Sequence, residues 1–168
     1  MCGGMEYRYV DPVTGEVKTR KTYFPIPKAQ IPVLPYDFER LDDPQAVLQA
    51  QTFCRWGKRK QEDDGDDVPV TGWARLLSLK EGKWNQYEPK KVKIPAVRWM
   101  EKDARWQSHW FDLPEGQCLL GVTLERQGER FVYVVTKTAS EELSGVHERM
   151  PFVLGKPAST MPAESQTG

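Results

Sequence analysis

The sequence lacks an excess of charge of either sign. Its 24 basic and 24 acidic residues give a formal net charge of zero, so bulk charge points to no class of partner and any contact with nucleic acid must be local. Long hydrophobic runs are missing too, since none approaches the roughly 18 apolar residues of a membrane span. Internal repeats are absent. We therefore expect one cytoplasmic domain without a membrane partner.

Cysteine and histidine are scarce. The three cysteines, Cys2, Cys54 and Cys118, are an odd number without a Cys-x-x-Cys pair. This pattern argues against a disulfide framework and favours a reducing compartment. Together with only two histidines, the cysteines form no recognised zinc ligand set. We expect neither a metal nor a cofactor.

The chain opens MCGGMEYRY. No basic segment followed by an apolar run is present, so we expect neither a secretory signal nor a lipoprotein anchor, and residue 2 is not the glycine that myristoylation needs. If Met1 is removed, Cys2 carries an α-amine, partly neutral at cellular pH, beside its thiol. Such an aminothiol attacks an aldehyde to form a Schiff base, which the sulfur then closes to a thiazolidine. Gly3 and Gly4 would let this end pack closely in a pocket.

Sequence patterning favours strands. In the first half, residues 6–10 and 17–24 flank the turn sequence DPVTGE and predict a hairpin. The proline-rich residues 24–35 are expected to be extended. Residues 42–56 fit either a short helix from Pro44 or a strand ending at Trp56. Residues 72–84 are expected to be irregular or to form a short helical turn. In the second half, strand-like runs separated by turn residues occupy residues 91–102, 105–113, 117–126 and 130–138.

The last part of the chain predicts a short helix at 140–145, with Ser140 as cap and Gly145 as stop, and a final strand at 151–154. Residues 155–168 have the composition of a disordered tail. We therefore predict an α+β fold, a single mainly antiparallel β domain over 1–154 with few short helices.

Two further residues are candidates for proton transfer. Glu101 follows the apolar Trp99 and Met100, so a partly buried carboxylate is expected there, against the alternative of a solvated charge at a strand end. His147 lies on a predicted loop, where functional side chains concentrate, although a lone histidine also serves structural roles. His109, between aromatic residues, is interpreted as structural. The six tryptophans suit either core packing or stacking on bases.

Taken together, these motifs resemble the SOS response-associated peptidase (SRAP) family. The resemblance covers roughly residues 1–154 and rests on Met1-Cys2-Gly3, on Ile94-Pro95-Ala96 with Glu101 at the family's spacing, on Thr136 to Ala139, and on HERMP at 147–151. Weaker similarities are Trp56-Gly57, Ala74-Arg75, and Pro27 with Gln30.

The resemblance implies a mostly β, barrel-like mixed sheet with a groove for single-stranded DNA. It also implies autocatalytic loss of Met1 followed by covalent capture of abasic sites by Cys2. This thiol peptidase and lyase-like chemistry would shield a reactive aldehyde as part of a DNA damage response. Glu101 and His147 match the family's proton-transfer residues and Arg75 its DNA-contacting arginine. We expect Trp56 and Trp73 to stack on bases, and the protein to be a monomer.

The chain departs from the family at several polar positions. Gly4 stands where the family has an arginine, which removes a phosphate contact, and Trp73 replaces the asparagine of Asn-Ala-Arg. Leu77 stands where the family has a glutamate. Tyr23-Phe24 stands where the family has a Tyr-Asn segment, so the asparagine is missing. The chain is therefore interpreted as a divergent, short member.

Three alternatives stay open. The first is a degenerate SRAP-like module that binds single-stranded DNA without chemistry. The second is an N-terminal-nucleophile amidotransferase, whose further Asn-Gly and Asp motifs the sequence lacks. The third is an unrelated small β domain.

Overall fold

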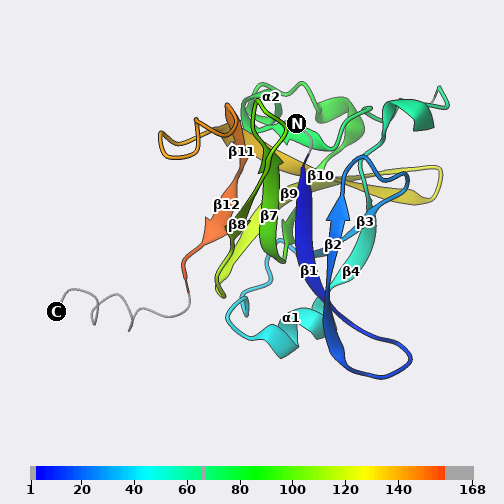
Figure 1. The fold of residues 1–168 in the computed structure, drawn as a ribbon. Coiled ribbons are helices and arrows are strands. Elements are labelled where there is room, and N and C mark those ends of the chain that lie inside the picture. The colour runs from blue at the N-terminus through cyan, green and yellow to red at the C-terminus, as the bar shows by residue number, and fades with distance from the viewer. Residues whose placement is uncertain (1–2, 66, 158–168) are drawn as a thin grey trace.

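The computed structural model describes residues 3–65 and 67–157. Over these residues the chain forms strands with a few short helices (Figure 1). The strands are β1 (Gly4–Val10), β2 (Val17–Tyr23), β3 (Gln30–Pro35), β4 (Thr52–Trp56), β5 (Trp73–Arg75), β6 (Lys90–Ile94), β7 (Ala96–Lys102), β8 (Ser108–Asp112), β9 (Gln117–Arg126), β10 (Glu129–Thr138), β11 (Arg149–Pro151) and β12 (Val153–Gly155). The helices are α1 (Pro44–Ala50), α2 (Leu76–Lys80) and the 3₁₀ turns η1 (Lys60–Glu62) and η2 (Asn85–Tyr87).

Five strands close into a small barrel in the order β10, β4, β3, β6, β9 and back to β10. All neighbours in the ring are antiparallel except β10 and β4, which run parallel. Strands β5 and β11 also pair with β10, and β12 pairs with β9. The mainly antiparallel β architecture with few short helices is therefore confirmed.

A second, four-stranded antiparallel sheet has the order β2, β1, β7, β8. Its residues Met5 and Trp99 belong to the main core cluster, which also holds barrel residues such as Ile31, Ile94 and Val132. The sheet therefore packs on the barrel through one continuous apolar core.

Strands β9 and β10 are buried on both faces, which explains their nearly continuous apolar sequences. On β10, Val132 and Val134 belong to the main core, whereas Tyr133 and Val135 belong to a second cluster. Trp84 lies in that second cluster, and its ring centroid is 5.1 Å from that of Tyr133. A strand with two apolar sides cannot alternate in hydropathy.

Several predicted elements differ from the structure in detail. The run 91–102 is two strands, because Pro95 lacks the N–H that would continue a ladder, and β6 and β7 join different sheets. Residues 42–56 contain both the helix and the strand that were predicted as alternatives. Asp43 caps α1, and β4 follows it and ends at Trp56. The proline-rich segment contains β3.

The short helix expected at 140–145 is replaced by turns. Ser140 O accepts from Leu143 N at 3.1 Å and Ser144 N at 2.9 Å, so the chain makes about one turn before Gly145. A single turn fixes several residues for one or two hydrogen bonds and does not propagate. The final strand is divided into β11 and β12, and the predicted tail from 155 lies mostly outside the described residues, with β12 ending at Gly155.

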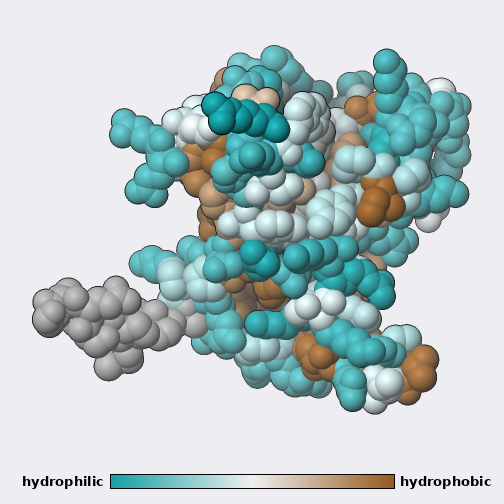
Figure 2. Space-filling model, in the orientation of Figure 1, coloured by the Kyte–Doolittle hydropathy of each residue, from teal (hydrophilic) through white to brown (hydrophobic). Residues whose placement is uncertain are grey.

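The surface is mostly hydrophilic on the face shown in Figure 2. Apolar residues gather at the tip of the β1–β2 hairpin, at the lower right of that view, where Val10, Val13 and Val17 are exposed. Within residues 3–65 and 67–157, no helix is long and apolar enough to span a bilayer.

Candidate active site

The first described residue, Gly3, is anchored between two strands. Its carbonyl accepts a hydrogen bond from Phe24 N at 3.0 Å, and the next residue, Gly4, pairs with Tyr23 on one side and Met100 on the other. Both glycines are buried. A Cβ atom at Gly3 would lie 3.1 Å from the Trp73 ring and 3.5 Å from the Met100 carbonyl. The close packing predicted for this glycine pair is therefore present.

A small cavity opens beside Gly3. Its volume of about 10 Å³ corresponds to about one water molecule. It is lined by Gly3, Gly4, Met5, Trp56, Trp73, Trp99, Met100, Glu101, Leu119, Val134 and Pro151. Residues of strands far apart in the sequence thus converge on the residue that is bonded to Cys2.

Glu101 supplies the carboxylate of this cavity. It lies near the end of β7, and its side chain is 2 % exposed among apolar neighbours. Its Oε1 accepts a hydrogen bond from Lys102 N at 3.0 Å, and it pairs with His109 across the β7–β8 ladder. Gly4, the first residue of β1, pairs with Met100 of β7, so Glu101 follows on β7 beside the start of β1. Figure 1 shows these two strands side by side.

Trp56 and Trp73 form an aromatic wall of the cavity, and Phe24 packs against both rings. Phe24 lies 4.7 Å from Trp73 and 5.5 Å from Trp56 between ring centroids, and the two tryptophans are 5.9 Å apart. Trp56 is 1 % exposed and its indole N–H donates to Gly72 O at 3.1 Å. The structure therefore places Trp56 in the core, with no ring face open to a base, because this cluster encloses it. Trp73 is half-buried.

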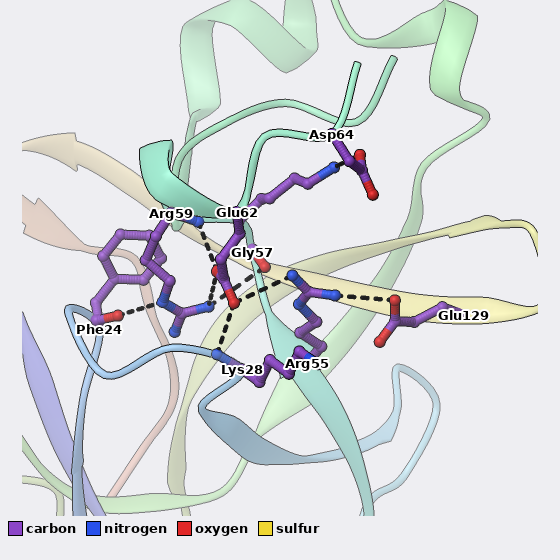
Figure 3. Close-up of polar contacts among 9 residues, drawn as sticks. Phe24, Lys28, Arg55, Gly57, Arg59, Glu62, Asp64 and Glu129 are labelled. Carbon is purple, nitrogen blue, oxygen red and sulfur yellow. Dashed lines mark hydrogen bonds and ion pairs between the residues drawn. The ribbon is translucent and has the colours of Figure 1, made fainter. Parts of the chain in front are cut away.

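Charged groups hold Phe24, which packs against this aromatic wall (Figure 3). The Arg59 guanidinium lies 4.3 Å above the Phe24 ring centroid, and its Nε donates to the Phe24 carbonyl. Arg59 is only 3 % exposed, and burial lowers the pKa of its guanidinium while the Glu62 carboxylate opposes that shift. Glu62 contacts Arg59 at 3.4 Å and Arg55 at 3.2 Å.

Glu62 is held as a carboxylate. Burial raises its pKa, but hydrogen bonds from the backbone N–H groups of Arg59 and Lys28 and the charges of Arg55 and Arg59 outweigh burial, so the pKa lies below its ordinary value. The buried cations therefore have a charged partner at cellular pH.

His147 precedes β11 and is half-buried. Its Nδ1 accepts a hydrogen bond from Arg149 N at 3.0 Å. The Arg149 side chain in turn donates to the buried Thr136 hydroxyl at 3.1 Å, and Thr136 pairs with both Pro151 and Arg75. His147 is thus joined to the strand that bears Pro151, but it is not itself among the residues that line the cavity.

Two arginines flank Thr136. Burial lowers the pKa of Arg149, and the nearby positive charge of Arg75 lowers it further, against the opposing effect of Glu148. The Arg149 Nε is buried without a hydrogen-bond partner among the described residues. Such a pair of guanidinium groups suits an anionic ligand such as a phosphate.

Of the candidates predicted from sequence, Glu101, Trp56 and Trp73 meet at one cavity with Gly3. Arg75 pairs with Thr136 in the β10–β5 ladder, and His147 precedes β11, which pairs with the same part of β10. Cys2 lies outside the described residues. Arg59 and Arg149 were not predicted as site residues from the sequence. Arg149 belongs to the HERMP motif and was identifiable there, but nothing in the order of residues 57–62 links Arg59 to Phe24.

Comparison with known protein families and with curated proteins finds no match for this chain. Within the described residues, no group of three or more His, Cys, Asp or Glu side chains is placed to hold a metal ion.

Proposed function

We propose that the protein captures abasic sites in single-stranded DNA as a covalent adduct of Cys2, formed after Met1 has been removed autocatalytically. One observation carries the proposal: Gly3, the residue bonded to Cys2, and the buried Glu101 line the same cavity although they are far apart in the sequence. A carboxylate there is available for proton transfer to and from groups at the chain end.

The proposed chemistry uses only the chain end and the open-chain aldehyde of the abasic sugar. The Cys2 amine adds to the aldehyde carbon, and the resulting carbinolamine loses water to give a Schiff base. The Cys2 sulfur then adds to the same carbon while the thiol proton passes to nitrogen, which closes a five-membered thiazolidine. Glu101 transfers protons in the amine and imine steps, and His147 assists opening of the sugar ring.

Arg75 and Arg149 are proposed to hold the DNA backbone. Their charges act on each other, and both lie at the β10 segment that carries Thr136. A phosphate between them would relieve this repulsion and would position the strand without reading its sequence.

The experiment is a denaturing gel of the protein incubated with a single-stranded oligonucleotide that carries one abasic site. We expect a heat-stable shifted band for the wild type, none for Cys2→Ala, and slowed formation for Glu101→Gln. Cys54→Ala is the matched control, because Cys54 is buried in the core, and it should keep the adduct. A band that survives in Cys2→Ala would reject the proposed nucleophile.

A second candidate is a single-stranded DNA-binding module without covalent chemistry. The observation in its favour is the small size of the cavity beside Gly3, about 10 Å³. The Trp73 ring lies only 3.1 Å from the position that a Cβ on Gly3 would take, and so little space beside the chain end favours reversible binding over a covalent reaction there. Binding of the abasic oligonucleotide without any adduct would select this second candidate.

A further inference from the structure

The loop between β7 and β8 carries an exposed tryptophan. It begins two residues after Glu101 and comprises residues 103–107. Trp106 at its tip is 67 % exposed, whereas core packing accounts for the buried Trp56, Trp84 and Trp99. A ring this exposed takes no part in core packing, so its face is accessible to a ligand.

Asp103 makes this loop a built structure. Its Oδ1 accepts from Arg105 N at 2.8 Å and from Gln107 N at 3.0 Å, and its Oδ2 lies 2.7 Å from His109 Nε2. The backbone closes the loop through Asp103 N to Gln107 O and Trp106 N to Asp103 O, each at 3.0 Å. The loop therefore presents Trp106 from a fixed frame.

The backbone of Trp106 is in the left-handed region, with φ of +64°. A bulky residue is uncommon in that region, which glycine and asparagine occupy more readily. The position thus tolerates a strained backbone in order to carry an exposed aromatic ring. Strain of this kind is found at ligand contacts.

Cations lie beside the ring. Lys102 Nζ is 5.8 Å from the Trp106 ring centroid and 3.4 Å from the Trp106 carbonyl. Arg105 is exposed, and its side chain makes no hydrogen bond or ion pair with the described residues. An aromatic face flanked by available positive charges complements a nucleotide, whose base stacks and whose phosphate is anionic.

We propose that Trp106 is a stacking platform for a base of single-stranded DNA, with Arg105 contacting an adjacent phosphate. The inference rests on the proposed function, in which the strand lies at the Gly3 cavity. The loop starts two residues beyond Glu101, and a strand advances about 3.3 Å per residue, so the platform serves a nucleotide next to the one being captured.

The test measures fluorescence anisotropy of a labelled, undamaged single-stranded oligonucleotide, which has no aldehyde. Trp106→Gly should weaken binding about fivefold or more, the usual effect of losing one stacking ring. Because glycine tolerates positive φ, the thermal midpoint should be unchanged or higher. Trp106→Phe keeps a ring and should keep most of the affinity. Arg105→Gln should lower the slope of log affinity against log salt by about 0.7.

Gln127→Gly is the matched control. Gln127 is an exposed residue with φ of 52° in the β9–β10 hairpin, so the substitution relieves the same backbone strain without removing a ring, and affinity should not change.

Three results would overturn the inference: affinity of Trp106→Gly within twofold of the wild type, a fall in its thermal midpoint that parallels the loss of binding, or no binding of undamaged DNA by the wild type. Failure of the proposed function is distinguishable, because it would leave binding dependent on Trp106 while no adduct forms on abasic DNA.

Discussion

Gly4 is the first residue of β1, and its surroundings leave little room for any side chain. A Cβ there would lie 2.8 Å from the Tyr23 ring, 3.1 Å from the Thr22 carbonyl and 3.2 Å from the end of Met100. An arginine introduced at this position would displace Tyr23 before it reached a phosphate.

The first prediction follows from this packing. Gly4→Ala should lower the free energy of unfolding by about 1–3 kcal/mol, the usual cost of overpacking a tight site. Gly145→Ala is the control, since a Cβ there meets nothing within 4 Å. Urea unfolding of both variants measures the difference, and equal stabilities would show that the β1 end adapts freely.

The two described cysteines should be chemically silent. Burial raises the pKa of Cys118 to about 11 and also raises the pKa of Cys54, so little thiolate is present at pH 8 and access is blocked. Iodoacetamide should therefore modify Cys2 at most in the native protein and all three thiols after denaturation, as read by mass spectrometry. Modification of Cys118 in the native state would contradict the core described here.

At the scale of elements, η1 and the loop around it support the aromatic wall of the cavity. Glu62 binds Arg55 and Arg59 there and has a depressed pKa. The stability that it contributes is fully present above its ordinary value of 4.5 and is lost as the pH falls through the lower folded-state pKa.

Glu62→Gln should accordingly lower the free energy of unfolding at pH 7 by about 1–3 kcal/mol, because it leaves Arg59 buried without its charged partner. Near pH 3 the difference from wild type should shrink. Glu129→Gln is the matched control: Glu129 also binds Arg55, at 3.0 Å, but its side chain is 49 % exposed, so a small effect is expected. A Glu62→Gln deficit that is constant from pH 7 to pH 3 would contradict the assignment.

Local patterns predicted most strands but not their partners. The turn sequence DPVTGE predicted the β1–β2 hairpin, which is present. Pro95 marks a break in residues 91–102, but nothing in this run indicates that its two halves join different sheets. The parallel pairing of β4 with β10 likewise depends on the whole barrel. Pairing between distant strands depends on the core that they share, so the sequence of one segment does not reveal its partner.

At the scale of the whole molecule, the candidate site forms only when the barrel and the second sheet pack together. Strand β1 brings Gly3 to the end of β7, and β4, β5 and β11 complete the cavity. The sequence predicted Glu101, Trp56 and Trp73 as site residues because each lies in or beside a sequence block that carries the resemblance. The buried position of Trp56 and the contact of Arg59 with Phe24 depend on packing, so they became visible only in three dimensions.

The most direct test of the proposed covalent capture is the intact mass of the protein before and after incubation with an abasic single-stranded oligonucleotide. We predict that the starting chain lacks Met1 and that the product has the mass of protein plus oligonucleotide minus one water, as thiazolidine formation requires. Cys2→Ala should give no such species. A wild-type chain that retains Met1, or that shows only its unmodified mass after incubation, would contradict the account.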